Sequence, residues 1–256
     1  MYGKLSFLLG NVKHNDKKNN NIRHYNVRFM KTTEINNINE LLDCFGRFRK
    51  SSIYKFRGQS NKEWDLIPKA GRSPFNNRND KDLFDQWKRR AIAYLERENY
   101  NEWELLAISQ HHGIPTRLLD WTHNPLVAAF FACIDNFDLD GAVYIYKPDG
   151  FIDINSSKPF GLTDGKVKFF QPTASSDRIM NQFGYFSIHT KPKVKLDETY
   201  GVLEKIIIPL GIKKEIIFAL NQFGVNNLTI FPDLEGLSKH LIWFYTNYEY
   251  WDGTEK

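Results

Sequence analysis

Residues 113–132 read GIPTRLLDWTHNPLVAAFFA, and this stretch decides the fold. Gly113 and Pro115 end the helix that we expect before them, because glycine commonly follows a helix and proline cannot continue one. Leu118–Thr122 is typical of a short buried segment. The stretch therefore predicts the end of a helix, a turn and a buried segment in close succession.

A second helix is expected directly after the buried segment. Thr122 and Asn124 offer the side-chain oxygen of an N-cap, and Pro125 suits the first helical position. The residues that follow, LVAAFFA, contain almost no polar position. We therefore predict a deeply buried helix over residues 125–135.

Hydrophobic periodicity predicts the remaining elements on either side. Helices are expected over residues 38–49, 80–99, 101–111, 212–222 and 233–246, and strands over 53–56, 142–146, 167–170, 185–188 and 202–208. This order indicates a single α+β domain over residues 38–250, with helices mostly in the first half. The second half should contribute most of a mixed or antiparallel sheet. Residues 1–37 are rich in Asn and Lys and are expected to form a polar, partly ordered arm.

Composition limits the class of protein. The chain has 256 residues, 15% of them aromatic, which is enough to close a sizeable core. Its two cysteines exclude a disulfide framework and a four-cysteine zinc site. No run of residues approaches the ~20 apolar positions of a membrane span, and the N-terminal residues do not have the pattern of a signal peptide. We expect a cytoplasmic protein without a membrane partner.

The charge balance leaves two interpretations open. The chain carries 35 basic and 30 acidic residues, a formal net charge of +5. A dedicated nucleic-acid binder often concentrates its Lys and Arg residues in one patch, whereas here they are scattered in small clusters at 13–18 and 88–90. A solvated basic surface is favoured, and a nucleic-acid partner stays an alternative.

The first candidate functional residue is Arg57, in the tripeptide Phe56-Arg57-Gly58 at the end of a predicted strand. An arginine placed where a strand stops, followed by glycine, can aim a rigid guanidinium group at an anion while the main chain approaches it closely. The alternative is a surface salt bridge.

The second candidate group lies in residues 110–124, where polar side chains interrupt apolar sequence. Asp120 stands between Leu119 and Trp121, so we expect its side chain to be partly buried and therefore paired. Arg117 and Arg57 are the available partners, and we predict that both meet Asp120 in one cleft. The alternative is a structural Arg–Asp pair that closes a loop.

Three histidines in the same run, His111, His112 and His123, do not predict a metal site. Adjacent histidines on a helix project about 100° apart, and no His-x-x-x-His pair is present. We expect no metal. A neutral imidazole that donates to a phosphate or to a main-chain carbonyl group is favoured instead.

The last candidate is Gln182, just before the strand predicted over 185–188. Its amide could read a ribose hydroxyl or another amide, and the alternative is a glutamine that completes a turn.

These motifs, in this order, resemble the FRG domain family. The resemblance rests on Phe56-Arg57-Gly58, on residues 113–132, on Arg178-Ile179 with Gln182 and Gly184, and on IFPDLEGL at 230–237, and it spans residues 40–245. It implies a protein of bacterial or phage type and supplies little about function.

The layout is also similar to that of ADP-ribosyltransferases, which implies NAD as a substrate and a toxin or phage-defence effector as the role. By this resemblance Arg57 holds phosphate, Thr122 supports the ribose and Gln182 matches the Gln of a Gln-x-Glu motif. The Glu position falls on Gly184, which departs from the pattern, and Asp120 is the available substitute. Asp120, Thr122 and Gln182 are thus the expected catalytic residues. The expected substrate-binding residues are Arg57, His111, His112, Arg117, Trp121 and Asn124.

Three functions remain open from the sequence. The first is an NAD-dependent transferase that modifies a nucleic acid or a protein, or an NAD hydrolase. The second is a nucleotide- or nucleic-acid-sensing module without turnover, and the third is a structural domain. The missing Glu favours the last two, whereas polar residues concentrated in an apolar stretch favour the first two.

Overall fold

A computed structural model describes residues 30–95, 99–172, 184–196 and 201–248. Its centre is one seven-stranded sheet with the strand order β1-β7-β4-β2-β3-β6-β5. β1 runs parallel to β7, and all other neighbours are antiparallel. The strands are β1 (Lys31–Glu34), β2 (Lys55–Gln59), β3 (Leu118–Thr122), β4 (Gly141–Pro148), β5 (Val167–Phe170), β6 (Gly184–His189) and β7 (Gly201–Ile208).

Most α-helices of the described residues occur close to the predicted positions, but the helix expected over 80–99 ends at Ala91 and the short helix Asn227–Ile230 was not expected. The helices are α1 (Ile38–Gly46), α2 (Asp80–Ala91), α3 (Glu102–His111), α4 (Pro125–Cys133), α6 (Lys213–Gln222), α7 (Asn227–Ile230) and α8 (Leu234–Asn247). Single-turn 3₁₀ helices cover Lys69–Gly71, Ile92–Tyr94 and Leu210–Ile212. The predicted α+β domain with a mixed sheet is confirmed.

The expectation that the helices lie mostly in the first half of the chain is wrong, whereas the second half does supply four of the seven strands, β4 to β7, as expected. Helices are spread along the chain, and β1, β2 and β3 come from its first half. Strand pairing is non-local, so a short strand such as β2 is recognised only when later strands flank it.

β1 lies in the segment that we expected to be a polar arm. Residues 31–34 pair with Glu204–Ile207 at the edge of the sheet, and three of the four are exposed. An exposed edge strand has little apolar periodicity, which is why the sequence did not reveal it. The rest of the expected arm, residues 1–29, lies outside the described residues.

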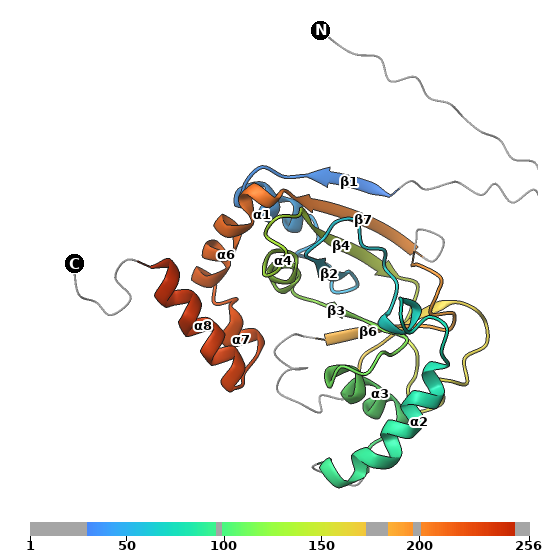
Figure 1. Ribbon diagram of the computed structural model, residues 1–256. Helices are drawn as coiled ribbons and strands as arrows, with labels where there is room; N and C mark the ends of the chain where they lie inside the picture. The colour runs from blue at the N-terminus through green and yellow to red at the C-terminus, as the bar shows by residue number, and fades with distance from the viewer. Residues whose placement is uncertain (1–29, 96–98, 173–183, 197–200, 249–256) are drawn as a thin grey trace, which may run out of the picture.

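Two groups of helices cover the same face of the sheet, which we call the helical face (Figure 1). α1, α4 and α6 pack over β2, β4 and β7 around buried residues such as Phe56, Val143 and Ile206. α2 and α3 pack over β3, β5 and β6 around Leu118 and Phe186. The boundary between the two groups falls above β2 and β3.

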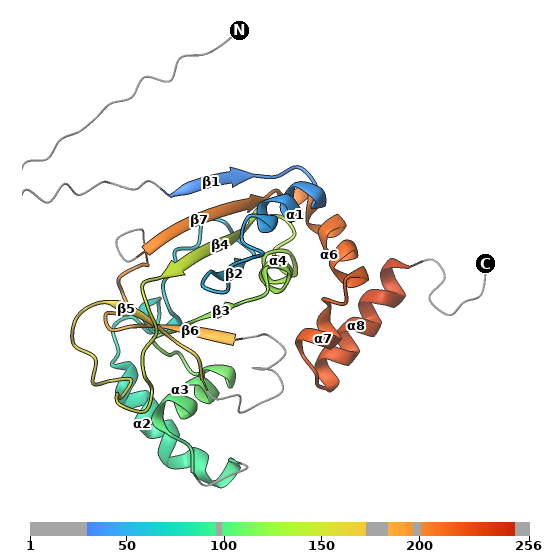
Figure 2. The same ribbon diagram turned by 180° about the vertical axis from the view of Figure 1, so that it is seen from behind.

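The opposite face, which we call the loop face, is covered by irregular segments. Its core contains Trp121 and Tyr144, with Leu66 and Leu196 supplied by the covering loops. Figure 2 shows the sheet from behind, with β7, β4, β2, β3 and β6 in succession. Because side chains alternate along a strand, Leu119 and Trp121 face these loops and Asp120 points to the helical face.

The glycine of the Phe56-Arg57-Gly58 tripeptide lets α4 pack directly on β2. A Cβ atom at Gly58 would lie 1.9 Å from the main-chain oxygen of Ala128. Ala128 is fully buried, and Phe56 is buried beside it. The tripeptide therefore combines a core residue, a polar residue and a close helix contact in three consecutive positions.

β2 and β3 diverge after a single residue pair. β2 pairs with β4 along its whole length, and β3 does the same with β6. Between β2 and β3 the only register pair of the described strands is Phe56 with Thr122. We call this opening the β2–β3 split.

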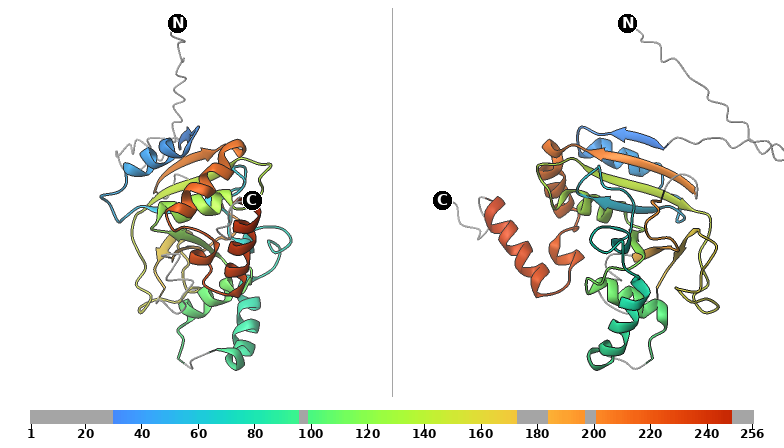
Figure 3. Two further views of the ribbon diagram at one scale, coloured as in Figure 1. Left: turned by 90° about the vertical axis from the view of Figure 1, so that its left-hand side faces the viewer. Right: turned by 45° about the vertical axis from the view of Figure 1, so that its right-hand side comes forward.

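The helices α7 and α8 project from α6, away from the sheet (Figure 3). Asp233 caps α8 by accepting a hydrogen bond from the main-chain nitrogen of Gly236. Gly236 is the one buried residue of α8. Within the described residues, the helices are all too short or too polar to cross a membrane.

Candidate functional site

A cavity of about 280 Å³, which we call the central pocket, opens where the two groups of helices meet. β2, β3 and β6 form its floor, and α3 and α4 form its walls. It is lined by Phe56, Arg57, Gly58, Ala107, Gln110, His111, Asp120, Trp121, Thr122, Val127, Ala128, Phe131, Gly184, Tyr185 and Phe186. Its lining is apolar with a few polar groups, as is usual for small-molecule sites.

The guanidinium group of Arg57 reaches β3 across the β2–β3 split. Its Nη1 atom donates a hydrogen bond of 2.7 Å to the main-chain oxygen of Asp120 and lies 3.6 Å from the Oδ2 atom of the same residue. The side chain is 16% exposed, and burial lowers the pKa of Arg57 while Asp120 opposes that shift. An arginine stays charged in spite of such a shift, so the split holds a permanent positive charge.

The sequence predicted that the Asp120 side chain is partly buried, and this prediction is wrong. The side chain is 62% exposed, because Asp120 sits on the helical face where α3 and α4 leave the floor of the pocket open. The Asp120 carboxylate is therefore accessible to solvent while it also lies close to Arg57.

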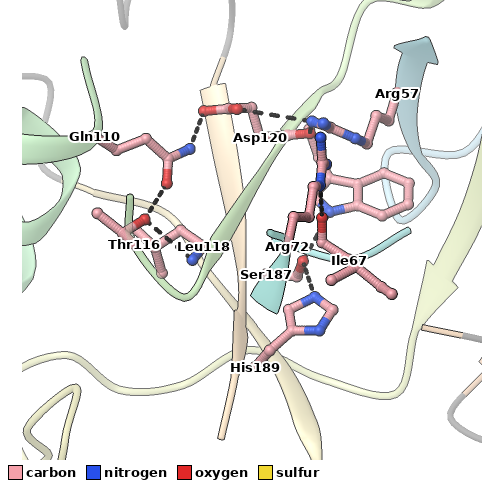
Figure 4. A network of polar contacts seen from close by, with 10 residues as sticks. Arg57, Ile67, Arg72, Gln110, Thr116, Leu118, Asp120, Ser187 and His189 are labelled. Carbon is pink, nitrogen blue, oxygen red and sulfur yellow. Dashed lines mark hydrogen bonds and ion pairs between the residues drawn. The ribbon is translucent and has the colours of Figure 1, made fainter. Parts of the chain in front are cut away.

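Gln110 holds the Asp120 carboxylate in place (Figure 4). Its Nε2 atom donates to Asp120 Oδ1 at 2.6 Å, and its Oε1 atom accepts a hydrogen bond from the hydroxyl of Thr116. The Thr116 hydroxyl itself accepts from the main-chain nitrogen of Leu118 at 3.2 Å. A hydroxyl that accepts one hydrogen bond donates another, and this arrangement fixes the Gln110 amide with its NH₂ group toward Asp120.

Residues 52–140 match the model of the FRG domain family. This part of the chain is similar to the FRG domain. The resemblance seen in the sequence is confirmed over this range, which is shorter than residues 40–245. No curated protein and no solved structure matches the chain.

The matched range supplies most of the central pocket. Arg57, Gln110 and Asp120 lie within the matched range, as do the lining residues of α3 and α4. Only residues 184–186, from β6, come from outside it. The pocket is therefore largely a feature of the part of the chain that is similar to the FRG domain family.

Arg117 does not join Arg57 and Asp120, and the prediction that it does is wrong. Its Nε and Nη2 atoms each lie 2.7 Å from the carboxylate of Asp80, in the first turn of α2. Both side chains are about nine-tenths buried. Arg117 directly precedes β3, and its side chain faces α2 rather than the pocket. The pair fastens α2 to the strand that carries Asp120.

Trp121 belongs to the core of the loop face. It is 2% exposed, and its Nε1 atom donates to Ser187 Oγ at 2.9 Å. Ser187 Oγ also lies 3.2 Å from Nε2 of the buried His189. Burial lowers the pKa of His189 to about 4, so this imidazole is neutral. Trp121 and these partners hold β3 against β6 beneath the pocket.

The other expected binding residues lie near the pocket in different ways. His111 lines it, whereas His112 is exposed outside the lining. Asn124 acts as the N-cap of α4, accepting from the main-chain nitrogen of Leu126 at 2.9 Å. Thr122 lines the pocket at the end of β3, and its hydroxyl accepts from the main-chain nitrogen of Asn124 at 3.0 Å.

Gln182 lies outside the described residues, and its expected role stays a prediction. Gly184, at the position where a Glu was expected by resemblance, lines the pocket. Among the described residues, no three His, Cys, Asp or Glu side chains come together in a way that could hold a metal ion.

Sequence reasoning missed three residues that shape the site. Gln110 and Thr116 lie inside the polar run of 110–124, and their spacing of six gave no sign of a hydrogen bond. Arg72 was missed because it follows a loop with no periodic signal. It lies beside Arg57 in Figure 4, and its Nε atom donates to the main-chain oxygen of Ile67 at 2.7 Å.

Proposed function

We propose that the central pocket binds the nicotinamide end of NAD and that the chain cleaves the bond between nicotinamide and ribose, transferring ADP-ribose to water or to a macromolecular acceptor. The observation that carries the proposal is the Asp120 carboxylate. It is exposed to the pocket while Arg57 and Gln110 hold it at 3.6 Å and 2.6 Å.

The chemistry needs a fixed negative charge. When the bond between ribose C1′ and the nicotinamide nitrogen breaks, its electron pair leaves with nicotinamide and positive charge develops on the ribose. A preorganised carboxylate beside that carbon stabilises the charge. The nucleophile then forms a C–O bond at C1′, and its proton passes to Asp120. Asp120 is the one carboxylate among the described residues of the lining.

The size and lining of the pocket also support the proposal. A volume of about 280 Å³ lies at the lower end of the range for ligand sites, so the pocket suits one end of a dinucleotide. Phe131 and Tyr185 offer aromatic surface for a flat ring. Arg57 supplies a charged donor for the phosphate that follows the ribose.

A second candidate function is nucleotide binding without turnover. Gly184 stands where the transferase resemblance expects a Glu, and no second carboxylate lines the described pocket. In that function the same Arg57 would hold a phosphate, and Asp120 would only orient the guanidinium group.

The deciding experiment measures free nicotinamide after the purified chain is incubated with NAD, with and without a cell extract that supplies acceptors. A matched control exists for Asp120→Asn. Asp65 is 58% exposed and lies 3.4 Å from Lys195, so Asp65→Asn removes a similar exposed carboxylate away from the pocket.

We expect wild type to release nicotinamide and Asp120→Asn to lower kcat about 100-fold with little change in affinity, because the carboxylate acts mainly in the transition state. Asp65→Asn should behave as wild type. NAD binding without release under any condition would support the second function, and neither binding nor release would exclude both. A toxin or defence role adds one expectation, that expression in bacteria lowers cellular NAD.

A further inference from the structure

Arg72 brings a second guanidinium group to the β2–β3 split. It follows the 3₁₀ turn Lys69–Gly71, and Figure 4 shows its guanidinium group beside that of Arg57. The Nε atom donates to Ile67. Within the described part of the chain, no residue accepts a hydrogen bond from its Nη1 or Nη2 atom.

The two arginines share one carboxylate. Asp120 attracts both Arg57 and Arg72, while the two guanidinium groups repel each other. Burial also lowers the pKa of each arginine. Two guanidinium groups beside the single Asp120 carboxylate leave one positive charge without a counterion at a partly buried position. Burial of an uncompensated charge costs free energy, and a bound anion would offset that cost.

The main chain holds Arg72 firmly in this position. A Cβ atom on the preceding Gly71 would lie 1.9 Å from the main-chain oxygen of Pro192, so the turn packs directly against the segment after β6. The main-chain nitrogen of Ala70 donates to the oxygen of Thr116 at 3.1 Å. Contacts with two separate segments of the main chain make this a built position rather than a free surface arginine.

We propose that Arg57 and Arg72 form a two-arginine clamp for the diphosphate group of a nucleotide at the β2–β3 split. Arg57 lines the central pocket, whereas Arg72 lies outside the lining and reaches the split beside Arg57. Arg57 contributes hydrogen bonds at the floor of the pocket, and Arg72 contributes the second charge that distinguishes a diphosphate from a monophosphate or an uncharged nucleoside. The clamp rests on the proposed function only for the identity of the nucleotide.

The experiment compares the affinities of ADP, AMP and adenosine by calorimetry at one ionic strength. The variants are Arg72→Gln, which removes the charge, and Arg72→Lys, which keeps it. Arg47→Gln is the matched control, because Arg47 is a partly exposed arginine that pairs at 3.0 Å with Glu204 of β7, a strand that β4 separates from the β2–β3 split.

We expect wild type to bind ADP more tightly than AMP and AMP more tightly than adenosine. Arg72→Gln should weaken ADP binding about 10-fold, as expected for the loss of a charge-assisted contact, and should leave adenosine binding within about twofold. Arg72→Lys should keep part of the preference for ADP, because the charge remains although the planar fork is lost. Arg47→Gln should match wild type.

Three outcomes would overturn the clamp. They are no binding of ADP by wild type, an equal loss of ADP and adenosine affinity in Arg72→Gln, and no loss of either. If Arg72→Gln does not fold, the test is the preference of Arg72→Lys for ADP over adenosine. A preference equal to that of wild type at every salt concentration would contradict the proposal. If wild type prefers ADP but never releases nicotinamide from NAD, the clamp stands and NAD cleavage fails.

Discussion

Nη1 of Arg57 donates a hydrogen bond of 2.7 Å to the main-chain oxygen of Asp120, so a side chain of one strand bonds the main chain of its neighbour. β2 and β3 share only the pair Phe56 and Thr122. The guanidinium group takes the place of the main-chain donor that a continuous ladder would supply. The sheet stays connected while an opening large enough for the central pocket forms.

Replacing Arg57 should affect both stability and binding. Arg57→Ala leaves the Asp120 oxygen without its donor, and we expect the free energy of unfolding to fall by about 1–3 kcal/mol. ADP affinity should fall about 10- to 150-fold for the same class of contact. Arg57→Lys should restore little, because an ammonium group cannot reproduce the fork. Urea unfolding and calorimetry measure the two effects, and unchanged ADP affinity in folded Arg57→Ala would exclude Arg57 from the site.

Gly58 should not tolerate a side chain. In Gly58→Ala the new Cβ atom meets the main chain of α4 at 1.9 Å, so the helix or the strand must shift, at a cost of about 1–3 kcal/mol or more. Gly46→Ala is the control, since a Cβ atom there has no neighbour within 4 Å and alanine is the better helix former. Thermal unfolding of both variants tests this, and equal melting temperatures would mean that α4 does not pack on β2 at Gly58.

Arg117 should matter for stability and not for ligand binding. Arg117→Ala leaves Asp80 unpaired in a site where both side chains are about nine-tenths buried, and we expect a loss of about 2–4 kcal/mol. ADP affinity of the folded fraction should stay within about twofold of wild type, because Arg117 does not line the central pocket. A selective loss of ADP affinity in Arg117→Lys, with normal stability, would return Arg117 to the site.

His189 should make the fold sensitive to acid. Burial lowers its pKa from 6.5 to about 4, so between these values the unfolded chain binds more protons than the folded one. Stability from this residue is fully present above about pH 6.5 and decreases as pH falls toward 4, by about 3 kcal/mol in total.

The urea midpoint measured from neutral to acidic pH tests the His189 prediction. His189→Gln should flatten the decrease below pH 6.5, because glutamine does not titrate. His123→Gln, at an exposed histidine, serves as the control and should follow wild type. A slope that is the same in His189→Gln and wild type would show that other groups cause the acid sensitivity.

The positions of most helices and strands could be predicted from the sequence. α4 begins at Pro125 after Asn124, as capping and the missing N–H of proline predict, and α3 ends at His111 before Gly113. These features are local, since the residues that form the hydrogen bonds lie within one turn of each other. The FRG motifs were also visible in the sequence because they are continuous in the chain.

Burial and partnership of the polar residues could not be predicted in the same way. The sequence placed Asp120 between two core residues but did not show that α3 and α4 leave it exposed. Arg117 and Arg57 were both available partners for Asp120 from the sequence, and only the position of α2 pairs Arg117 with Asp80 instead.

The sequence by itself determined most of the helices and strands of this protein, the FRG motifs and the residue types available for a site. The tertiary structure decided which of those residues meet. Arg57 and Asp120 are 63 positions apart, and Arg72 approaches them from a loop. They meet because β2 and β3 diverge and because α3 and α4 leave the sheet uncovered between them. Distances between residues so far apart depend on packing over the whole sheet, which no local pattern of sequence encodes.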